Sequence, residues 1–96
     1  MTNRRRFQPT RPASEETEHY DRVVLRWNYS EEKATRIIEC RHGIQWVVQH
    51  KMGTRKGSPI WRSRHFCRTR AALEAILPSM SSEIAGTLPE RFPQAA

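Results

Sequence analysis

The sequence has only two cysteines in 96 residues, and its apolar runs are short. No run approaches the roughly 20 residues that a helix needs to cross a bilayer, and the basic amino terminus is not followed by the apolar stretch of a secretory signal. Two cysteines are too few for a disulfide framework, and a reducing compartment would keep Cys40 and Cys67 as thiols. These absences predict a cytoplasmic protein with no membrane partner.

Apolar residues are also scarce, at 36% of the chain against the roughly 45–50% that is usual in globular domains. A chain of this length supports a single hydrophobic core. Residues 1–21 contain little that could be buried to offset the entropy of ordering them. We therefore predict a disordered arm over residues 1–21, one domain over 22–88 and a frayed tail over 89–96.

Acidic residues are nearly absent from the middle of the chain. The formal net charge is +7, and it is concentrated in residues 1–11, which carry +4, and in residues 36–70, which carry +8. Most of the central cations are arginines, whose planar fork binds phosphate oxygens in pairs. This clustering favours an anionic partner, and the alternative is a solvated basic face that keeps a small protein soluble.

Several segments show strand patterns. Residues 22–29 alternate between apolar and polar, and residues 36–41 and 44–50 are rich in β-branched and aromatic types. His42-Gly43 between the last two runs predicts a tight hairpin turn. Glycine, serine and proline in residues 52–59 predict a loop with a basic tip.

Residues 60–66 predict a further strand. Strict alternation would place Ile60, Arg62, Arg64 and Phe66 on one face and Trp61, Ser63 and His65 on the other. If Trp61, Ser63 and His65 face a helix, then Arg62 and Arg64 lie on the open face of the sheet.

Helix-forming residues follow this strand. Thr69 is a good N-cap, and residues 70–77 carry one apolar stripe that Pro78 should end. One more turn could follow from Ser81, with Ser82 as its cap and Gly86 as its stop. The predicted fold class is α+β: an antiparallel sheet of three or four strands, with one C-terminal helix packed on one face and the other face free.

A three-stranded sheet ending in a helix, with arginines on its last strand, resembles the AP2-type and integrase amino-terminal DNA-binding modules over residues 36–77. The resemblance implies a sheet in the major groove with the helix behind it. It also implies base and phosphate contacts from Arg41, Arg62 and Arg64, together with Arg55 and Lys56. The glycine-rich opening of that family is missing here. Residues 39–49 also resemble short bacterial proteins, which implies no particular activity.

The remaining cations extend the candidate nucleic-acid-binding set. A flexible arm with Arg4, Arg5 and Arg6 could follow a DNA backbone or enter a minor groove, unless it is an inert solubilising tail. The full candidate set is Arg41, Arg55, Lys56, Arg62, Arg64, Arg68 and Arg70, with Arg4, Arg5 and Arg6 in the arm. Most of the three tryptophans should be core residues, although an exposed one beside arginine would suit base stacking.

Two pairs of possible zinc ligands occur at strand spacing, Cys40 with His42 and His65 with Cys67. An intervening strand would hold the pairs roughly 9–10 Å apart, which is too far for one tetrahedral site. We therefore assign no metal and no cofactor.

The sequence has no nucleophile elbow, no glycine-rich phosphate loop and no paired carboxylates on a clear element. Glu15-Glu16 and Glu31-Glu32 lie in polar segments that we predict to be solvated. We interpret the chain as a small, non-enzymatic DNA-binding protein with an accessory or regulatory role. The alternative is a protein-interaction module, an inhibitor or adaptor that docks on an acidic partner surface.

Overall fold

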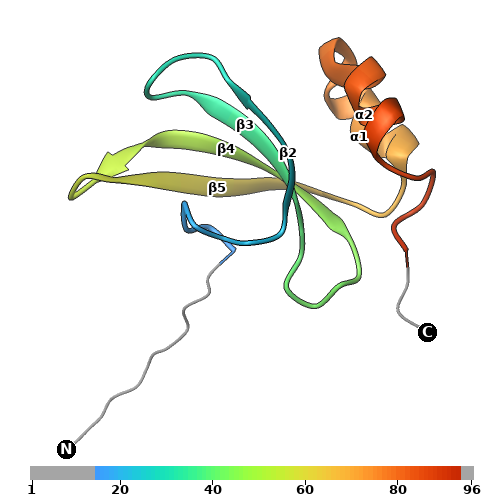
Figure 1. The fold of residues 1–96 in the computed structure, drawn as a ribbon, viewed down its shortest axis with the longest axis horizontal. Coiled ribbons are helices and arrows are strands. Elements are labelled where there is room, and N and C mark those ends of the chain that lie inside the picture. The colour runs from blue at the N-terminus through green and yellow to red at the C-terminus, as the bar shows by residue number, and fades with distance from the viewer. Residues whose placement is uncertain (1–14, 94–96) are drawn as a thin grey trace, which may run out of the picture.

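The computed structural model describes residues 15–93, in which four strands form one antiparallel sheet in chain order. The strands are β2 (Val23–Asn28), β3 (Ala34–Glu39), β4 (Trp46–Arg55) and β5 (Ser58–Cys67). The helical elements α1 (Arg70–Ile76), η2 (Pro78–Met80) and α2 (Ser81–Thr87) follow. Figure 1 shows the helices to one side of the sheet, with the β4–β5 hairpin reaching away from them. The α+β class and the antiparallel sheet are confirmed, with two short α-helices where one was predicted.

Both faces of the sheet are covered near its centre. One buried cluster combines Ile37, Trp46 and Val48 of the strands with Leu73 of α1 and Ile84 of α2. A smaller cluster on the opposite face contains Ile38, Cys40 and Val47, with Tyr20 and Val23 packed against it. Strand β3 is therefore almost wholly buried, as expected for a central strand with two apolar faces. Of the helices in residues 15–93, none is long and apolar enough to cross a membrane.

The tight hairpin turn lies at Lys56-Gly57, and the prediction that placed it at His42-Gly43 is wrong. Arg55 pairs with Ser58, and the two residues between them have φ values of 53° and 82°. Positive φ at both central residues is the signature of a type I′ turn, whose twist matches that of the flanking strands. The predicted loop over 52–59 is therefore mostly strand. Residues 40–45 form the longer connection between β3 and β4, where Gly43 does adopt a positive φ of 69°.

A β-bulge in β5 overturns the predicted division of its side chains between the two faces. Val48 pairs with His65 and Gln49 pairs with Ser63, so Arg64 is the extra residue. His65 pairs with Val48 and lies on the helix-bearing face, as predicted. Arg62 pairs with His50 and occupies the same face, so the prediction that it lies on the open face is wrong. Trp61, Ser63 and Phe66 consequently lie on the opposite face. The expectation that Trp61 and Ser63 face the helices is wrong, because an inserted residue reverses the alternation beyond it.

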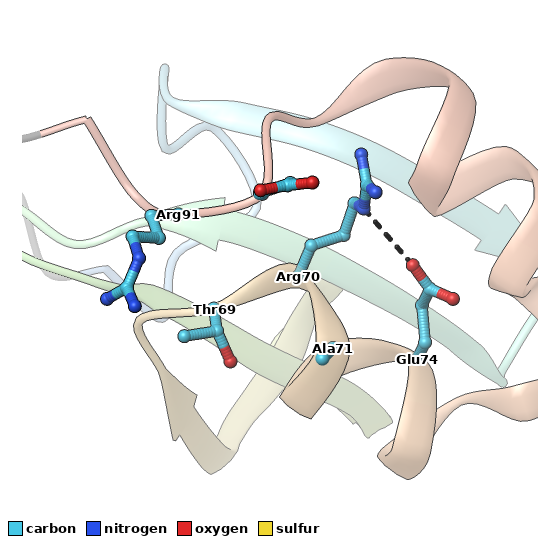
Figure 2. Close-up of a pocket in the computed structure, with 6 residues that line it drawn as sticks. Thr69, Arg70, Ala71, Glu74 and Arg91 are labelled. Carbon is cyan, nitrogen blue, oxygen red and sulfur yellow. Dashed lines mark ion pairs between the residues drawn. The ribbon is translucent and has the colours of Figure 1, made fainter.

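The C-terminal part begins at the predicted cap. The Thr69 side chain accepts a hydrogen bond from the Ala72 amide at 3.2 Å, and Arg70 forms a 3.2 Å ion pair with Glu74 one turn later (Figure 2). Helix α2 begins at Ser81, and its N-cap position is Met80.

The chain after α2 returns to the sheet. Phe92 is buried with its ring edge against Trp46, at a centroid distance of 5.1 Å. The Phe92 amide donates to the carbonyl of Arg68 at 2.8 Å, and the Arg70 amide donates to the carbonyl of Glu90 at the same distance. Residues 90–92, which the sequence assigned to a frayed tail, therefore pair with the segment that leads into α1.

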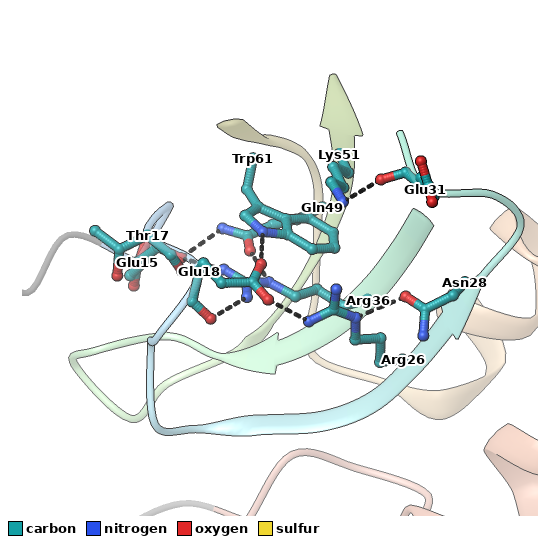
Figure 3. A network of polar contacts seen from close by, with 10 residues as sticks. All are labelled: Glu15, Thr17, Glu18, Arg26, Asn28, Glu31, Arg36, Gln49, Lys51 and Trp61. Atoms are coloured by element: carbon teal, nitrogen blue, oxygen red, sulfur yellow. Dashed lines mark hydrogen bonds and ion pairs between the residues drawn. The ribbon is translucent and has the colours of Figure 1, made fainter. Parts of the chain in front are cut away.

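Residues 15–20, which we call the strap, cover the face of the sheet opposite the helices (Figure 3). Beneath the strap lies the guanidinium of Arg36, a β3 residue that is 0% exposed. It donates to the carbonyls of Glu15 and Thr17 at 3.0 and 2.8 Å and to Gln49 Oε1 at 2.7 Å. Its Cζ atom lies 4.1 Å from the centroid of the Trp61 ring. The strap was predicted to belong to the disordered arm, of which residues 1–14 lie outside the described residues.

Arg36 remains a cation at neutral pH even though burial lowers its pKa to about 10. A buried charge is tolerated only when hydrogen bonds replace its lost hydration. The strap carbonyls provide these bonds, and a neighbouring carboxylate, Glu18, provides opposite charge. The position of the strap and the charge of Arg36 therefore depend on each other.

We expect Arg36→Lys to lower the free energy of unfolding by about 3 kcal/mol or more, because one ammonium cannot reach the strap carbonyls and Gln49 at once. Urea denaturation of the full chain measures this. The matched control is Arg55→Lys, which alters an exposed arginine at the end of β4 and should change stability by less than about 0.5 kcal/mol. Equal stability of the two variants would contradict the structural role of Arg36.

Candidate nucleic-acid interface

The β4–β5 hairpin projects beyond the rest of the sheet. Pairing of β3 with β4 ends where Thr35 meets His50, whereas β4 and β5 continue to pair as far as Arg55 and Ser58. The hairpin beyond His50 is therefore a two-stranded ribbon. We call β4, β5 and their turn the basic hairpin, since its charged residues are all cations: Lys51, Arg55, Lys56, Arg62 and Arg64.

The side chains of four of these cations are free to meet a ligand. Arg55, Lys56, Arg62 and Arg64 are exposed, whereas Lys51 donates to the carbonyl of Glu31 at 2.6 Å. In the described part of the chain, ion pairs join Arg26 to Glu18 and Arg70 to Glu74, and neither involves the hairpin. An unneutralised group of cations on one projecting element is suited to binding a polyanion.

On the helix-bearing face, the basic hairpin places Arg62 beside two histidines, and the charge of Arg64 acts on one of them, His50. Arg62 lies directly across from His50, and Arg64 and His65 follow at the bulge. The Nδ1 atom of His50 lies 2.9 Å from the hydroxyl of buried Thr35. Burial lowers the pKa of His50 below its ordinary value, and the charges of Arg64 and His65 lower it further. His50 is therefore neutral at pH 7 in the free protein.

The glutamates of the strap hold the opposite face of the sheet. Glu15 Oε2 accepts from the Arg41 amide at 2.6 Å, and Glu16 Oε2 accepts from the Ser63 amide at the bulge at 2.8 Å. Glu18 accepts from Trp61 Nε1 at 2.8 Å and from Arg26 at 3.0 Å. Glu16 is exposed, as predicted, but both members of the Glu15-Glu16 pair bind backbone amides of the sheet, which the sequence did not indicate.

A cavity of about 750 Å³ lies between the strap and the basic hairpin. Arg55, Trp61 and Arg62 line it from the basic hairpin, and Glu16 and Glu18 line it from the strap. On this side the carboxylates of Glu16 and Glu18 would lie close to a bound phosphate and repel it, although the charges of Arg26 and Arg36 partly offset that of Glu18. The face with Arg62, Arg64 and His65 has no such acidic cover from the strap, and it is the better surface for a polyanion.

The structure divides the remaining predicted residues between two places. Arg41 and Arg68 are exposed at the opposite end of the sheet, where Trp46 pairs with Cys67. Arg70 is engaged by Glu74 and by the carbonyl of Leu88 at 3.1 Å, so it has a structural partner. The predicted arm residues Arg4, Arg5 and Arg6 lie outside the described residues.

The possible zinc ligands do not come together. Cys40 packs in the smaller cluster and Cys67 in the larger one, on opposite faces of the sheet. Within residues 15–93, no three histidine, cysteine, aspartate or glutamate side chains gather closely enough to hold a metal ion. The two cysteines are buried and free.

Sequence reasoning missed His50 and His65 as members of the interface and Arg36 as a core residue. A register pairing brings His50 beside Arg62, and a bulge turns His65 toward it. Neither event leaves a pattern in the sequence, because a bulge inserts one residue into otherwise ordinary strand composition. A signal for Arg36 was present in its position inside an apolar strand, where a charged residue needs buried partners.

Comparisons of the chain with protein-family models, with curated protein sequences and with solved structures find no match. The resemblance to the AP2-type and integrase amino-terminal modules stays a prediction. The geometry and charge of the basic hairpin are therefore the basis for inferring a function.

We expect low pH to weaken the binding of the strap to the sheet, because it protonates Glu18. Burial raises the pKa of this carboxyl, but the hydrogen bonds from Trp61 and Arg26 and the charges of Arg26 and Arg36 outweigh burial and lower it. A lowered carboxyl pKa adds stability at neutral pH, and this stability is lost as the pH falls through the folded-state value, below the ordinary 4.5.

Glu18→Gln should therefore cost up to about 1 kcal/mol at pH 7 and much less at about pH 3, as measured by urea denaturation at both pH values. Glu32→Gln, which alters an exposed glutamate of the β2–β3 connection, is the control. A destabilisation by Glu18→Gln that is the same at both pH values would show that its charge is not responsible.

Proposed function

We propose that this protein binds duplex DNA through the basic hairpin. One observation carries the proposal: a two-stranded ribbon projects from the sheet with exposed cations that no acid within residues 15–93 pairs. The major groove of B-DNA, about 12 Å wide, admits a two-stranded β-ribbon. Phosphate contacts from flanking arginines would supply affinity by releasing counterions.

The placement of cations on the hairpin suits this docking. Arg55 and Lys56 are at the tip and would meet the groove first, whereas Arg62 and Arg64 lie nearer the base, within reach of a phosphate strand. Arginine forks bind two phosphate oxygens at once, which fixes orientation as well as charge. In this proposal the hairpin directs the contacts and the helices stabilise the sheet from which it projects.

The amino-terminal arm would add a second basic element. It precedes the strap, in which the Glu15 carboxylate accepts from the Arg41 amide. We propose that Arg4, Arg5 and Arg6 follow the DNA backbone, with Arg41 and Arg68 as further phosphate contacts. Binding in the cytoplasm without catalysis, as an accessory or regulatory protein, is part of this proposal.

Exposed apolar side chains favour the alternative of a protein partner. Phe66 is 58% exposed on β5, and Ile44 is 45% exposed beside Arg68 and Arg91, with which it lines a cavity of about 420 Å³. An apolar anchor flanked by arginines suits an acidic protein surface. Pull-downs with and without nuclease separate the two functions, because a protein partner would remain bound after the nucleic acid is digested.

We expect Arg62→Ala with Arg64→Ala to weaken binding to duplex DNA at least tenfold, or about 1.4 kcal/mol, with nearly unchanged melting temperature because both side chains are exposed. Fluorescence anisotropy across a salt series measures the affinity. The slope of log affinity against log salt should decrease by about one for each arginine–phosphate interaction that the substitutions remove.

The control removes the same charge from the other end of the sheet, by Arg41→Ala with Arg68→Ala. It should weaken binding less than the hairpin variant does. A larger effect of the control would move the interface to that end, and a preference for RNA over DNA would change the ligand. The absence of any binding to DNA or RNA at about 50 mM salt would refute the proposed function.

A further inference from the structure

We propose that Arg62, Arg64 and His65 of β5, together with His50 of the neighbouring strand β4, form a phosphate-binding subsite whose occupation is coupled to proton uptake. The inference rests on the proposed function and adds to it a defined ligand group and a dependence on pH. The ligand group is one phosphate of the bound strand, and inorganic phosphate would occupy the same place.

The β5 bulge creates the subsite. Without it, alternation would place Arg64 with Arg62 but turn His65 to the strap side. With Arg64 as the extra residue, His65 pairs with Val48 and therefore shares the face of Arg62, which pairs with His50. Bulges commonly re-aim side chains at functional sites in this way.

The bulge is also held in place from the other face. The Ser63 amide donates to Glu16 Oε2 at 2.8 Å, and the Ser63 hydroxyl accepts from Gln49 Nε2 at 3.0 Å. Gln49 in turn accepts from buried Arg36. The strap network thus fixes the backbone that presents the two arginines, and the subsite is organised before any ligand arrives.

The groups around His50 make it sensitive to an anion. From β3 it faces the neutral hydroxyl of Thr35, and from β5 it faces Arg62, Arg64 and His65. Trp27 of β2 pairs with Thr35 and so lies in line with His50 across the sheet, two strands away. Its Nε1 donates to Glu83 Oε1 of α2 at 2.9 Å, so this acid is already engaged by another side chain. No acid on β4 or β5 offsets the positive charge near His50.

A phosphate over the arginines would reverse this balance. Burial has the largest effect on the His50 pKa, but the negative charge of the phosphate offsets the added repulsion from Arg64 and His65 and attracts a proton to the imidazole. The bound state then holds more protons than the free state. By linkage, affinity then rises as the pH falls through the range in which His50 titrates. Folding stability follows the opposite direction, because a histidine with a lowered pKa favours the folded state when neutral.

Two measurements on the full chain test the subsite. The first is affinity for a labelled duplex at constant ionic strength between about pH 6 and about pH 8, which should be at least about threefold tighter at the lower pH. The second follows the imidazole resonances of the histidines by NMR during pH titration, with inorganic phosphate or with chloride at equal ionic strength. Phosphate should raise the titration midpoint of His50. Melting curves at each pH confirm that the protein remains folded.

The variants identify the responsible group. His50→Gln, which keeps a side chain able to hydrogen-bond Thr35, should flatten the pH dependence of DNA binding. His42→Gln removes an exposed histidine from the β3–β4 connection and should leave that pH dependence unchanged. Arg62→Ala with Arg64→Ala should abolish the effect of phosphate on the His50 midpoint.

The outcomes distinguish the inference from the proposed function. DNA binding that depends on salt but not on pH, or that keeps its pH dependence in His50→Gln, would overturn the subsite and leave the proposed function standing. No DNA binding at any pH would refute the proposed function, and the phosphate titration would then decide the subsite alone. A His50 midpoint that is the same in phosphate and in chloride would overturn it.

Discussion

The burial of the Arg36 guanidinium beneath Trp61 is the interaction on which much of this structure depends. A cation removed from water needs a shell of acceptors, and the strap supplies it with carbonyls at 2.8 to 3.3 Å. The face of the Trp61 ring, which attracts a cation, packs against the Arg36 guanidinium. The arrangement orders a polar segment that could not bury enough apolar surface to order itself. It also explains why a face of the sheet that the sequence suggested to be free is covered.

This covered face determines what the other face of β5 can do. The strap carboxylates bind the sheet through Trp61, Ser63 and Arg26, so the acidic groups of the strap lie on one side of the hairpin. The cations of β5 that share a face with His50 are left on the other side. A polyanion would meet the side from which the strap is absent.

The sequence predicted those features that depend on local chemistry. Thr69 caps α1 as expected from its hydroxyl and the helix formers that follow, and the strand composition of 44–50 and 60–66 appears in β4 and β5. The tight turn was misplaced because Gly43 and Gly57 both permit positive φ, and only the pairing of the flanking strands selects between them. The faces of β5 were misassigned from Trp61 to Ser63 because alternation holds only while the register is continuous.

The amino-acid sequence by itself determined the α+β class, the antiparallel sheet, the start of α1 and the concentration of arginine in the middle of the chain. These follow from side-chain propensity, periodicity and charge, which act over a few residues. The tertiary structure alone decided that Arg36 is buried while Arg62 is exposed, although the two arginines look alike in their strands. It also decided that His50 lies directly across from Arg62 on the neighbouring strand. Such outcomes depend on which distant groups supply hydrogen bonds and on one inserted residue in a strand, and neither is encoded in a local pattern.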